Sequence, residues 1–221
     1  VCSSDLEQNV NSGTLQFMVL PGRVEEIRYS NSSAHGPWRT AFSVRPGDIL
    51  NIRDVEQGLE QMKRVSSQSV TMQLLPGTSV GTSIIELSIK QEKPVHGSIS
   101  IDNSGLESTG VYQGSFTASL DQAFRANDTL TMSLSGDLSG AGSIKGTRAA
   151  SLNYVIPHGK DTFSLSFSKS RYHQTIQSNP YDFTYSGKST TMKAKWNHVW
   201  SRTQREKRAF DISISTRHNH R

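Results

Sequence analysis

The chain has 221 residues, a hydrophobic content of 33%, a mean hydropathy of -0.51 and a formal net charge of +5. The basic excess would suit a nucleic-acid-binding protein, but the lysines and arginines are scattered until Lys193, so we expect no nucleic-acid partner. The single cysteine, Cys2, excludes an internal disulfide framework and a thiolate metal cluster. No run of about 20 apolar residues occurs, so the sequence predicts no membrane-spanning helix.

The N-terminus has two unusual features. The chain starts without Met, and residues 1–6 resemble the translation of a sequencing-library adapter. We therefore expect residues 1–6 to be foreign, and residues 1–13 to be the remnant of a longer N-terminal region.

Residues 14–31 are expected to begin a small domain with an extended segment. Apolar residues alternate at Leu15, Phe17 and Val19, and the pattern resumes at Val24 after a Pro-Gly pair. A strand imposes this period of two on its side chains.

Two helices are predicted next. Residues 40–44 are expected to form a short helix, and residues 52–65 a longer one. Asn51 is a favourable N-cap, and Asp54 in the first turn suits the helix dipole. Gly58 should weaken the helix by roughly 1 kcal/mol relative to alanine. The apolar stripe of the longer helix is expected to comprise Ile52, Val55, Leu59, Met62 and Val65.

Two segments with the composition of strands, residues 69–75 and 83–90, follow the helices. A turn with the sequence PGTSVG lies between them. The first part of the chain, residues 14–91, is therefore an α+β unit with the order strand, helix, helix, strand, strand.

From residue 95 onward the pattern changes to strands alone. Residues 95–120 are expected to form two strands joined by a turn rich in Gly, Ser and Asn, with Tyr112, Phe116 and Leu120 on one face. Hydroxyl and amide side chains occupy the other face. A soluble sandwich would normally carry Lys and Glu there, whereas hydroxyls also suit the wet interior of a membrane barrel. The residues of this second face are Gln113, Ser115, Thr117 and Ser119.

Five more alternating segments follow, each near the 9 to 11 residues, roughly, with which a tilted strand crosses a bilayer. They are residues 129–136, 148–156, 162–169, 190–200 and 209–215. Their connectors alternate between short ones and looser ones rich in Gly, Ser and polar residues, as is typical of outer-membrane barrels. Residues 95–221 are therefore expected to hold about seven strands of a transmembrane barrel.

Two motifs carry a resemblance to a known family. The first, in NIRDVEQGLE, comprises Asn51, Arg53, Asp54, Glu56, Gln57, Gly58 and Leu59. The second, in the turn after residue 101, comprises Asp102, Asn103, Gly105, Thr109, Gly110 and Gln113. In this order and spacing, the motifs resemble those of the outer-membrane transporters of two-partner secretion, which export haemolysins, adhesins and contact-dependent inhibition proteins.

The resemblance implies a domain organisation. Residues 14–91 would be the second periplasmic POTRA domain, and residues 95–221 the first roughly seven strands of a sixteen-stranded barrel. The first POTRA domain, the plug helix and the remaining strands would lie outside this chain. The full-length protein would be a monomeric barrel in the outer membrane of a Gram-negative bacterium.

The resemblance also implies a mechanism. The transporter would recognise an unfolded exoprotein through its POTRA domains and pass it across the membrane without nucleotide. The client would add a strand to an exposed edge of the domain, for which we expect Val70, Met72 and Leu74 to supply the edge. Lumen-facing side chains would be Gln113, Ser115, Thr117, Ser119, Lys193 and Lys195.

Two other functions stay open at this point. A protein insertase of the same superfamily would usually have several POTRA domains, and a passive porin would have none. No enzyme motif was found, so we predict no catalytic residue, no cofactor and no metal site.

Basic residues gather near the C-terminus, and two interpretations apply to them. The first is a solvated turn near lipid headgroups; the second places Lys193 and Lys195 in the pore, facing the passing chain. The group consists of Lys193, Lys195, Arg202, Arg205, Lys207 and Arg208.

Overall fold

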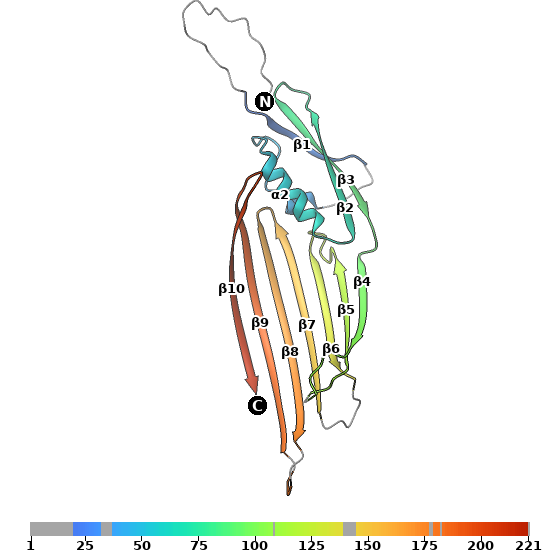
Figure 1. Ribbon diagram of the computed structural model, residues 1–221. Helices are drawn as coiled ribbons and strands as arrows, with labels where there is room; N and C mark the ends of the chain where they lie inside the picture. Colours follow the sequence, from blue (N-terminus) through green and yellow to red (C-terminus); the bar gives the residue numbers. More distant parts are fainter. Residues whose placement is uncertain are drawn as a thin grey trace, which may run out of the picture.

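Two sheets follow one another along the chain in the computed structural model (Figure 1). The first is a small three-stranded sheet with two helices, and the second is a seven-stranded sheet. The structure describes residues 20–31, 37–107, 109–138, 145–176, 179–181 and 183–220. Neither helix in these ranges has the length and apolar character that spanning a membrane requires.

The first unit has the predicted order of strand, helix, helix, strand, strand. Its elements are β1 (Arg23–Tyr29), α1 (Trp38–Ala41), α2 (Ile52–Lys63), β2 (Gln68–Pro76) and β3 (Thr82–Gln91). β3 lies in the middle of the sheet, with β1 parallel to it on one side and β2 antiparallel to it on the other. The predicted alternation at residues 14–19 lies outside the described residues.

The helices match the prediction in kind and differ at their ends. The side chain of Asn51 caps α2 as predicted and accepts a hydrogen bond of 3.0 Å from the backbone N–H of Arg53. α2 ends at Lys63, two residues earlier than predicted. The predicted bounds 40–44 of the short helix are wrong: α1 spans Trp38–Ala41, because Phe42 adopts an extended conformation that places its ring in the core.

The core of this unit lies between the sheet and α2. Val55 and Met62 are fully buried, whereas Leu59 is only partly buried and Ile52 is 44% exposed, so the predicted stripe is only partly correct. Two polar residues on another side of α2 are buried as well, because that side contacts the second sheet. The buried apolar residues of the core are Val24, Ile27, Ala41, Phe42, Val44, Val55, Met62, Val70, Ile85 and Leu87.

Gly58 allows α2 to approach Phe42 closely. A Cβ atom at position 58 would lie 2.5 Å from two carbons of the Phe42 ring, which is too close for any side chain. The sequence indicated only the cost of this glycine to the helix; the reason for it is contact with a residue sixteen positions away.

The second sheet is antiparallel throughout, and its strands lie in chain order. Its strands are β4 (Val95–Asp102), β5 (Gln113–Asp121), β6 (Thr129–Asp137), β7 (Lys145–His158), β8 (Asp161–Ile176), β9 (Phe183–Arg202) and β10 (Lys207–His220). Within the described residues β4 and β10 are edge strands, so the sheet is not closed. Figure 1 shows that it is curved.

Several strands are longer than predicted. β8 and β9 extend to Ile176 and Phe183, which pair with each other, although the predicted segments were residues 162–169 and 190–200. These extensions consist largely of polar residues and lack the alternation from which a strand is recognised. Pairing with the neighbouring strand therefore determines their conformation.

The two faces of the sheet differ sharply in chemistry. We call one the polar face: in one row across the strands, Ser98, Thr117, Ser133, Ser151, Ser168 and Thr191 lie side by side. We call the other the apolar face: in one row, Val95, Leu120, Leu130, Tyr154, Leu165, Ala194 and Ile214 lie side by side.

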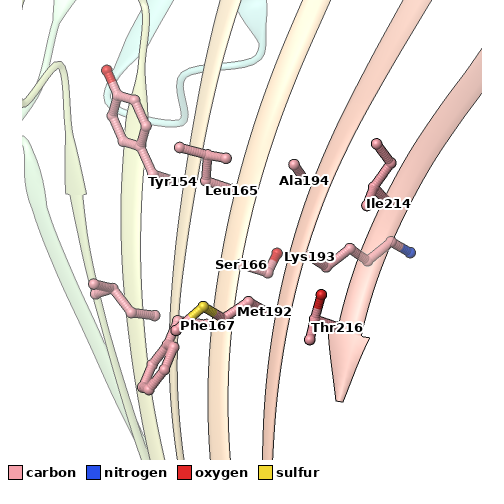
Figure 2. Close-up of a pocket in the computed structure, with 10 residues that line it drawn as sticks. Tyr154, Leu165, Ser166, Phe167, Met192, Lys193, Ala194, Ile214 and Thr216 are labelled. Atoms are coloured by element: carbon pink, nitrogen blue, oxygen red, sulfur yellow. The ribbon is translucent and has the colours of Figure 1, made fainter. Parts of the chain in front are cut away.

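Figure 2 shows part of the apolar face on β7 to β10. The small side chain of Ala194 lies between Leu165 and Ile214 and leaves a shallow depression of about 550 Å³. Phe167 and Met192 line the end of the depression that lies farther from α2.

We expect Gly58→Ala to lower the free energy of unfolding of the first unit by roughly 1 to 3 kcal/mol, because displacing the buried Phe42 ring outweighs the gain in helix propensity. Urea denaturation of the segment 14–91, whose core lies wholly within it, measures this change. Gly22→Ala is the matched control, since a Cβ there would have no atom closer than 4.0 Å. A Gly58→Ala protein as stable as its parent would contradict the close contact.

Candidate functional site

The first candidate site is the open edge of β2. Two backbone hydrogen bonds flank its pairing with β3: Glu92 N–H donates to the Ser67 carbonyl at 2.7 Å, and Gly77 N–H donates to the Thr82 carbonyl at 2.9 Å. Since hydrogen-bonded and non-hydrogen-bonded pairs alternate in an antiparallel ladder, the odd-numbered residues between them bond to β3. The even-numbered residues direct their N–H and C=O groups toward the open edge. These include the three predicted residues, Val70, Met72 and Leu74.

The side chains of these three residues differ in exposure. Val70 is buried in the core, Met72 is half-buried, and Leu74 is 37% exposed. A ligand at this edge would therefore meet mainly backbone groups, with Leu74 as an apolar contact at one end. Such a surface pairs with an extended chain of almost any sequence.

The six residues predicted to face a lumen all lie on the polar face. Ser115, Thr117 and Ser119 are each within 3.2 Å of a hydroxyl on a neighbouring strand. The Gln113 side chain instead donates to the Gly110 carbonyl at 2.7 Å and so fixes the loop before it. Lys195 forms an ion pair of 3.2 Å with Asp211, and Lys193 is exposed.

The second family motif builds the connector between β4 and β5, at the end of the sheet away from α2. Asp102 accepts hydrogen bonds from the backbone and side chain of Ser104. Gly105 is required there, because a Cβ would lie 2.0 Å from the Gly110 carbonyl. Gly110 itself has a φ of +114°, which L side chains rarely adopt. The motif thus supplies the turn chemistry of a tightly folded loop.

The first family motif forms a polar junction between α2 and the turns of the second sheet. Asp54 forms an ion pair of 2.7 Å with Lys160, in the turn between β7 and β8. Gln57 accepts a hydrogen bond of 2.9 Å from Arg202 at the end of β9, and Glu56 lies 3.7 Å from the same guanidinium. Sequence reasoning identified these motif residues but not what they contact.

Glu60 lies at the centre of the charged part of the junction. It binds Arg202 and, at 2.5 Å, the ammonium group of Lys207. Burial alone would raise the pKa of its carboxyl group, but the hydrogen bonds and charges of Lys207 and Arg202 outweigh burial and lower that pKa. Arg202 and Lys207 of this basic group are therefore held by the helix, although the Lys207 side chain is still 39% exposed.

Gln61 is an almost completely buried polar residue of the junction, with 1% of its surface exposed. Its side-chain N–H group donates to the Gly159 carbonyl at 3.1 Å and lies 3.3 Å from the Thr162 hydroxyl. The Gly159 N–H group in turn donates to the carbonyl of Thr40, on α1, at 2.7 Å. The turn between β7 and β8 is thus tied to both helices.

The turn between β5 and β6 is tied to the chain just after α2. Asp121 accepts hydrogen bonds from the Ser67 N–H group at 2.8 Å and the Ser66 hydroxyl at 2.9 Å. The side chains of Gln68 and Asn127 are joined at 2.9 Å. Sequence reasoning missed these residues; the acidic and amide side chains in the connector were the only available signal.

We expect Gln61→Ala to expose the turn between β7 and β8 to solvent, because it leaves the buried Gly159 carbonyl without its donor, at a cost of about 1 to 3 kcal/mol. Amide hydrogen exchange should show about tenfold or greater loss of protection at Gly159 and its neighbours. Gln73→Ala, on an exposed part of β2, is the control. Unchanged protection in Gln61→Ala would show that Gln61 does not hold this turn.

The comparisons with known proteins agree with this arrangement. The model of the family "Haemolysin secretion/activation protein ShlB/FhaC/HecB" matches residues 81–221, and that of the POTRA domain matches residues 23–76. An outer membrane transporter, CdiB-2 of Burkholderia pseudomallei, is 36% identical over 211 residues, which cover 96% of this chain and 36% of that protein. The haemolysin transporter protein HpmB of Proteus mirabilis is 29% identical over 92% of this chain and 36% of its own length.

Solved structures show the same fold. CdiB from Escherichia coli has a TM-score of 0.88 and 30% identity, and the match covers 97% of this chain and 40% of that one. CdiB from Acinetobacter baumannii has a TM-score of 0.79 and 26% identity, covering 90% and 38%. The chain therefore spans well under half the length of its relatives. Since the family model covers more than half of the chain, the protein belongs to the haemolysin secretion/activation family ShlB/FhaC/HecB, with a POTRA domain followed by antiparallel strands of an outer-membrane barrel.

Proposed function

We propose that this chain is part of a two-partner secretion transporter, which recognises an unfolded exoprotein and passes it across the outer membrane without nucleotide. The observation that carries the proposal is the open edge of β2, held beside a curved sheet with one polar and one apolar face. An exoprotein chain captured at that edge would lie next to the seven-stranded sheet, whose polar face suits water and whose apolar face suits lipid.

The same arrangement supports an orientation. We propose that residues 14–91 form the second POTRA domain, on the periplasmic side, and that residues 95–221 form the first seven strands of the barrel. The short turns of the sheet contact α2, and outer-membrane barrels place their short turns in the periplasm. The full-length protein would be a monomeric barrel in a Gram-negative outer membrane.

Client recognition would use strand addition. Within the part of the chain that the structure describes, the outward backbone groups of Val70, Met72 and Leu74 have no strand partner, so they can serve as donors and acceptors for an incoming extended chain. Because backbone groups are common to all sequences, such an edge would suit a long and varied client.

The polar face would line the channel. Hydroxyl groups that bond to one another across the strands offer neutral contacts that release a passing chain easily. Lys193 and Lys195 would add positive charge to this lining, with Lys195 partly neutralised by Asp211. The opposite arrangement would place hydroxyl rows in hydrocarbon, where their desolvation is costly.

The two alternatives have less support. A passive porin would have no need of a POTRA domain, which this chain has. For an insertase, no feature of the described residues gives separate support, and the relatives carry transporter names.

We expect Met72→Pro to reduce secretion of the exoprotein by the full-length transporter roughly threefold to tenfold, because proline removes one outward N–H donor, worth about 0.5 to 1.5 kcal/mol. Position 72 does not bond to β3, so the sheet itself should persist. Quantifying exoprotein in the culture medium measures the effect.

Met72→Ala is the matched control, because it removes the same half-buried side chain but keeps the N–H group. It should secrete at close to the parental level. If Met72→Pro assembles a channel and secretes as well as Met72→Ala, the edge of β2 has no part in recognition.

Cysteine labelling tests the assignment of the two faces. Single cysteines at Ser115 and Thr117 should react with a water-soluble thiol reagent in the assembled full-length protein, whereas cysteines at Phe116 and Leu120 should be protected by lipid. All four should react equally after denaturation. The reverse labelling pattern would show that the lumen and the lipid are assigned to the wrong faces.

A further inference from the structure

The apolar face ends, on the side away from α2, in a group of four basic residues that we call the rim cluster. Arg148 on β7, Arg171 on β8 and Lys188 on β9 are direct neighbours in the register of the strands. Lys169 lies two residues from Arg171 on β8. All four side chains are exposed.

The rim cluster marks a change in the character of this face. Along β8, Phe163, Leu165 and Phe167 are followed on the same face by Lys169 and Arg171. Beyond Arg171, the same side of β8 is polar. The apolar surface therefore gives way to basic and then to polar side chains.

The height of the cluster fits the border of a bilayer. Arg171 lies eight residues beyond Phe163, which corresponds to roughly 26 Å along a strand and roughly 20 Å in height for a strand tilted by about 40°. The apolar band of outer-membrane barrels is about 25 Å tall, and long basic side chains extend toward its border. Trp196, paired with Phe163, lies near the opposite border, where aromatic residues commonly gather.

Among the described residues, no ion pair balances the positive charge of the rim cluster. Within the described strands, Asp161 is the only acidic residue on the apolar face, and it lies at the α2 end, bonded to Trp196 and His198. By contrast, Lys195 pairs with Asp211, and Lys207 pairs with Glu60. Like charges directly opposite one another on adjacent strands are destabilising, so an external anion would relieve this arrangement.

The surface next to the cluster is suited to hydrocarbon. The depression around Ala194 begins at Phe167 and Met192 (Figure 2). In the register of the strands, these two residues lie one row closer to α2 than Lys169. An anionic group at the rim cluster and an acyl chain in the depression could thus belong to one amphiphilic molecule.

We propose that the rim cluster binds the phosphate groups of a lipid headgroup. One arginine guanidinium can bind two oxygens of a phosphate group at once, and lysine adds a point charge. The proposal rests on the orientation given above, in which this end of the sheet lies in the outer leaflet, so the ligand is the phosphorylated glycolipid of that leaflet. Its acyl chains lie along the apolar face.

The test measures binding of lipid A by the full-length transporter in detergent, with neutral phosphatidylcholine and inorganic phosphate as comparison ligands. The triple variant R148Q/R171Q/K188Q should bind lipid A about tenfold or more weakly than the parent, since each basic residue near an anionic lipid surface contributes of the order of a few-fold in affinity. The charge-preserving variant R148K/R171K should stay within roughly threefold of the parent.

R217Q is the control for loss of charge. Arg217 lies on the polar face and donates to Thr191, so its removal should leave lipid A binding unchanged. Parental affinity should also fall as salt concentration rises. Inorganic phosphate should bind far more weakly than lipid A, because it makes no contact with the apolar face; equal binding of the two would show an anion site rather than a lipid site and would overturn the proposal.

Channel conductance in planar bilayers separates this proposal from the function proposed above. If the triple variant forms a normal channel but binds lipid A as tightly as the parent, the rim cluster does not bind lipid, and the transporter assignment is unaffected. If the parent protein forms no channel but binds lipid A through the cluster, the transporter assignment fails and the lipid site stands.

Discussion

The alternation of the antiparallel ladder is the constraint on which the rest of the structure depends. In the seven-stranded sheet it places hydroxyl rows on one face and mainly apolar rows on the other. In β2 the same alternation directs the N–H groups of Val70 and Met72 away from β3. One geometric rule therefore produces both the two faces of the seven-stranded sheet and the open edge of β2. In each case the position of a residue, even or odd, decides which way its groups point.

This rule also explains how much could be predicted from the sequence. The order of elements, the cap at Asn51 and the two faces of β5 depend on local patterns, and the structure confirms them. The full lengths of β8 and β9 could not be predicted, since their far ends lack alternation and are specified by each other. Nor could the role of Gly58, which depends on the packing of Phe42.

The junction was the least predictable part. Gln61 contacts residues about a hundred positions later in the chain, and no local pattern links them. The motif at Asp54, Gln57 and Gly58 nevertheless marked the right helix. One side of α2 packs Gly58 against Phe42, and another presents polar groups to the turns. A single short motif therefore serves the core and the junction at once.

The junction has a mechanical consequence. α2 and the four residues after it hold the three hairpin turns at this end of the sheet, those after β5, β7 and β9. A helix is stiff, so the spacing of these turns cannot change without breaking polar contacts at one or more of them. α2 thus fixes the curvature of the seven-stranded sheet at this end. Tilting the helix would move all three hairpins together. β2 begins five residues after the helix ends. A force applied to β2 would therefore be transmitted to the seven-stranded sheet through the same contacts.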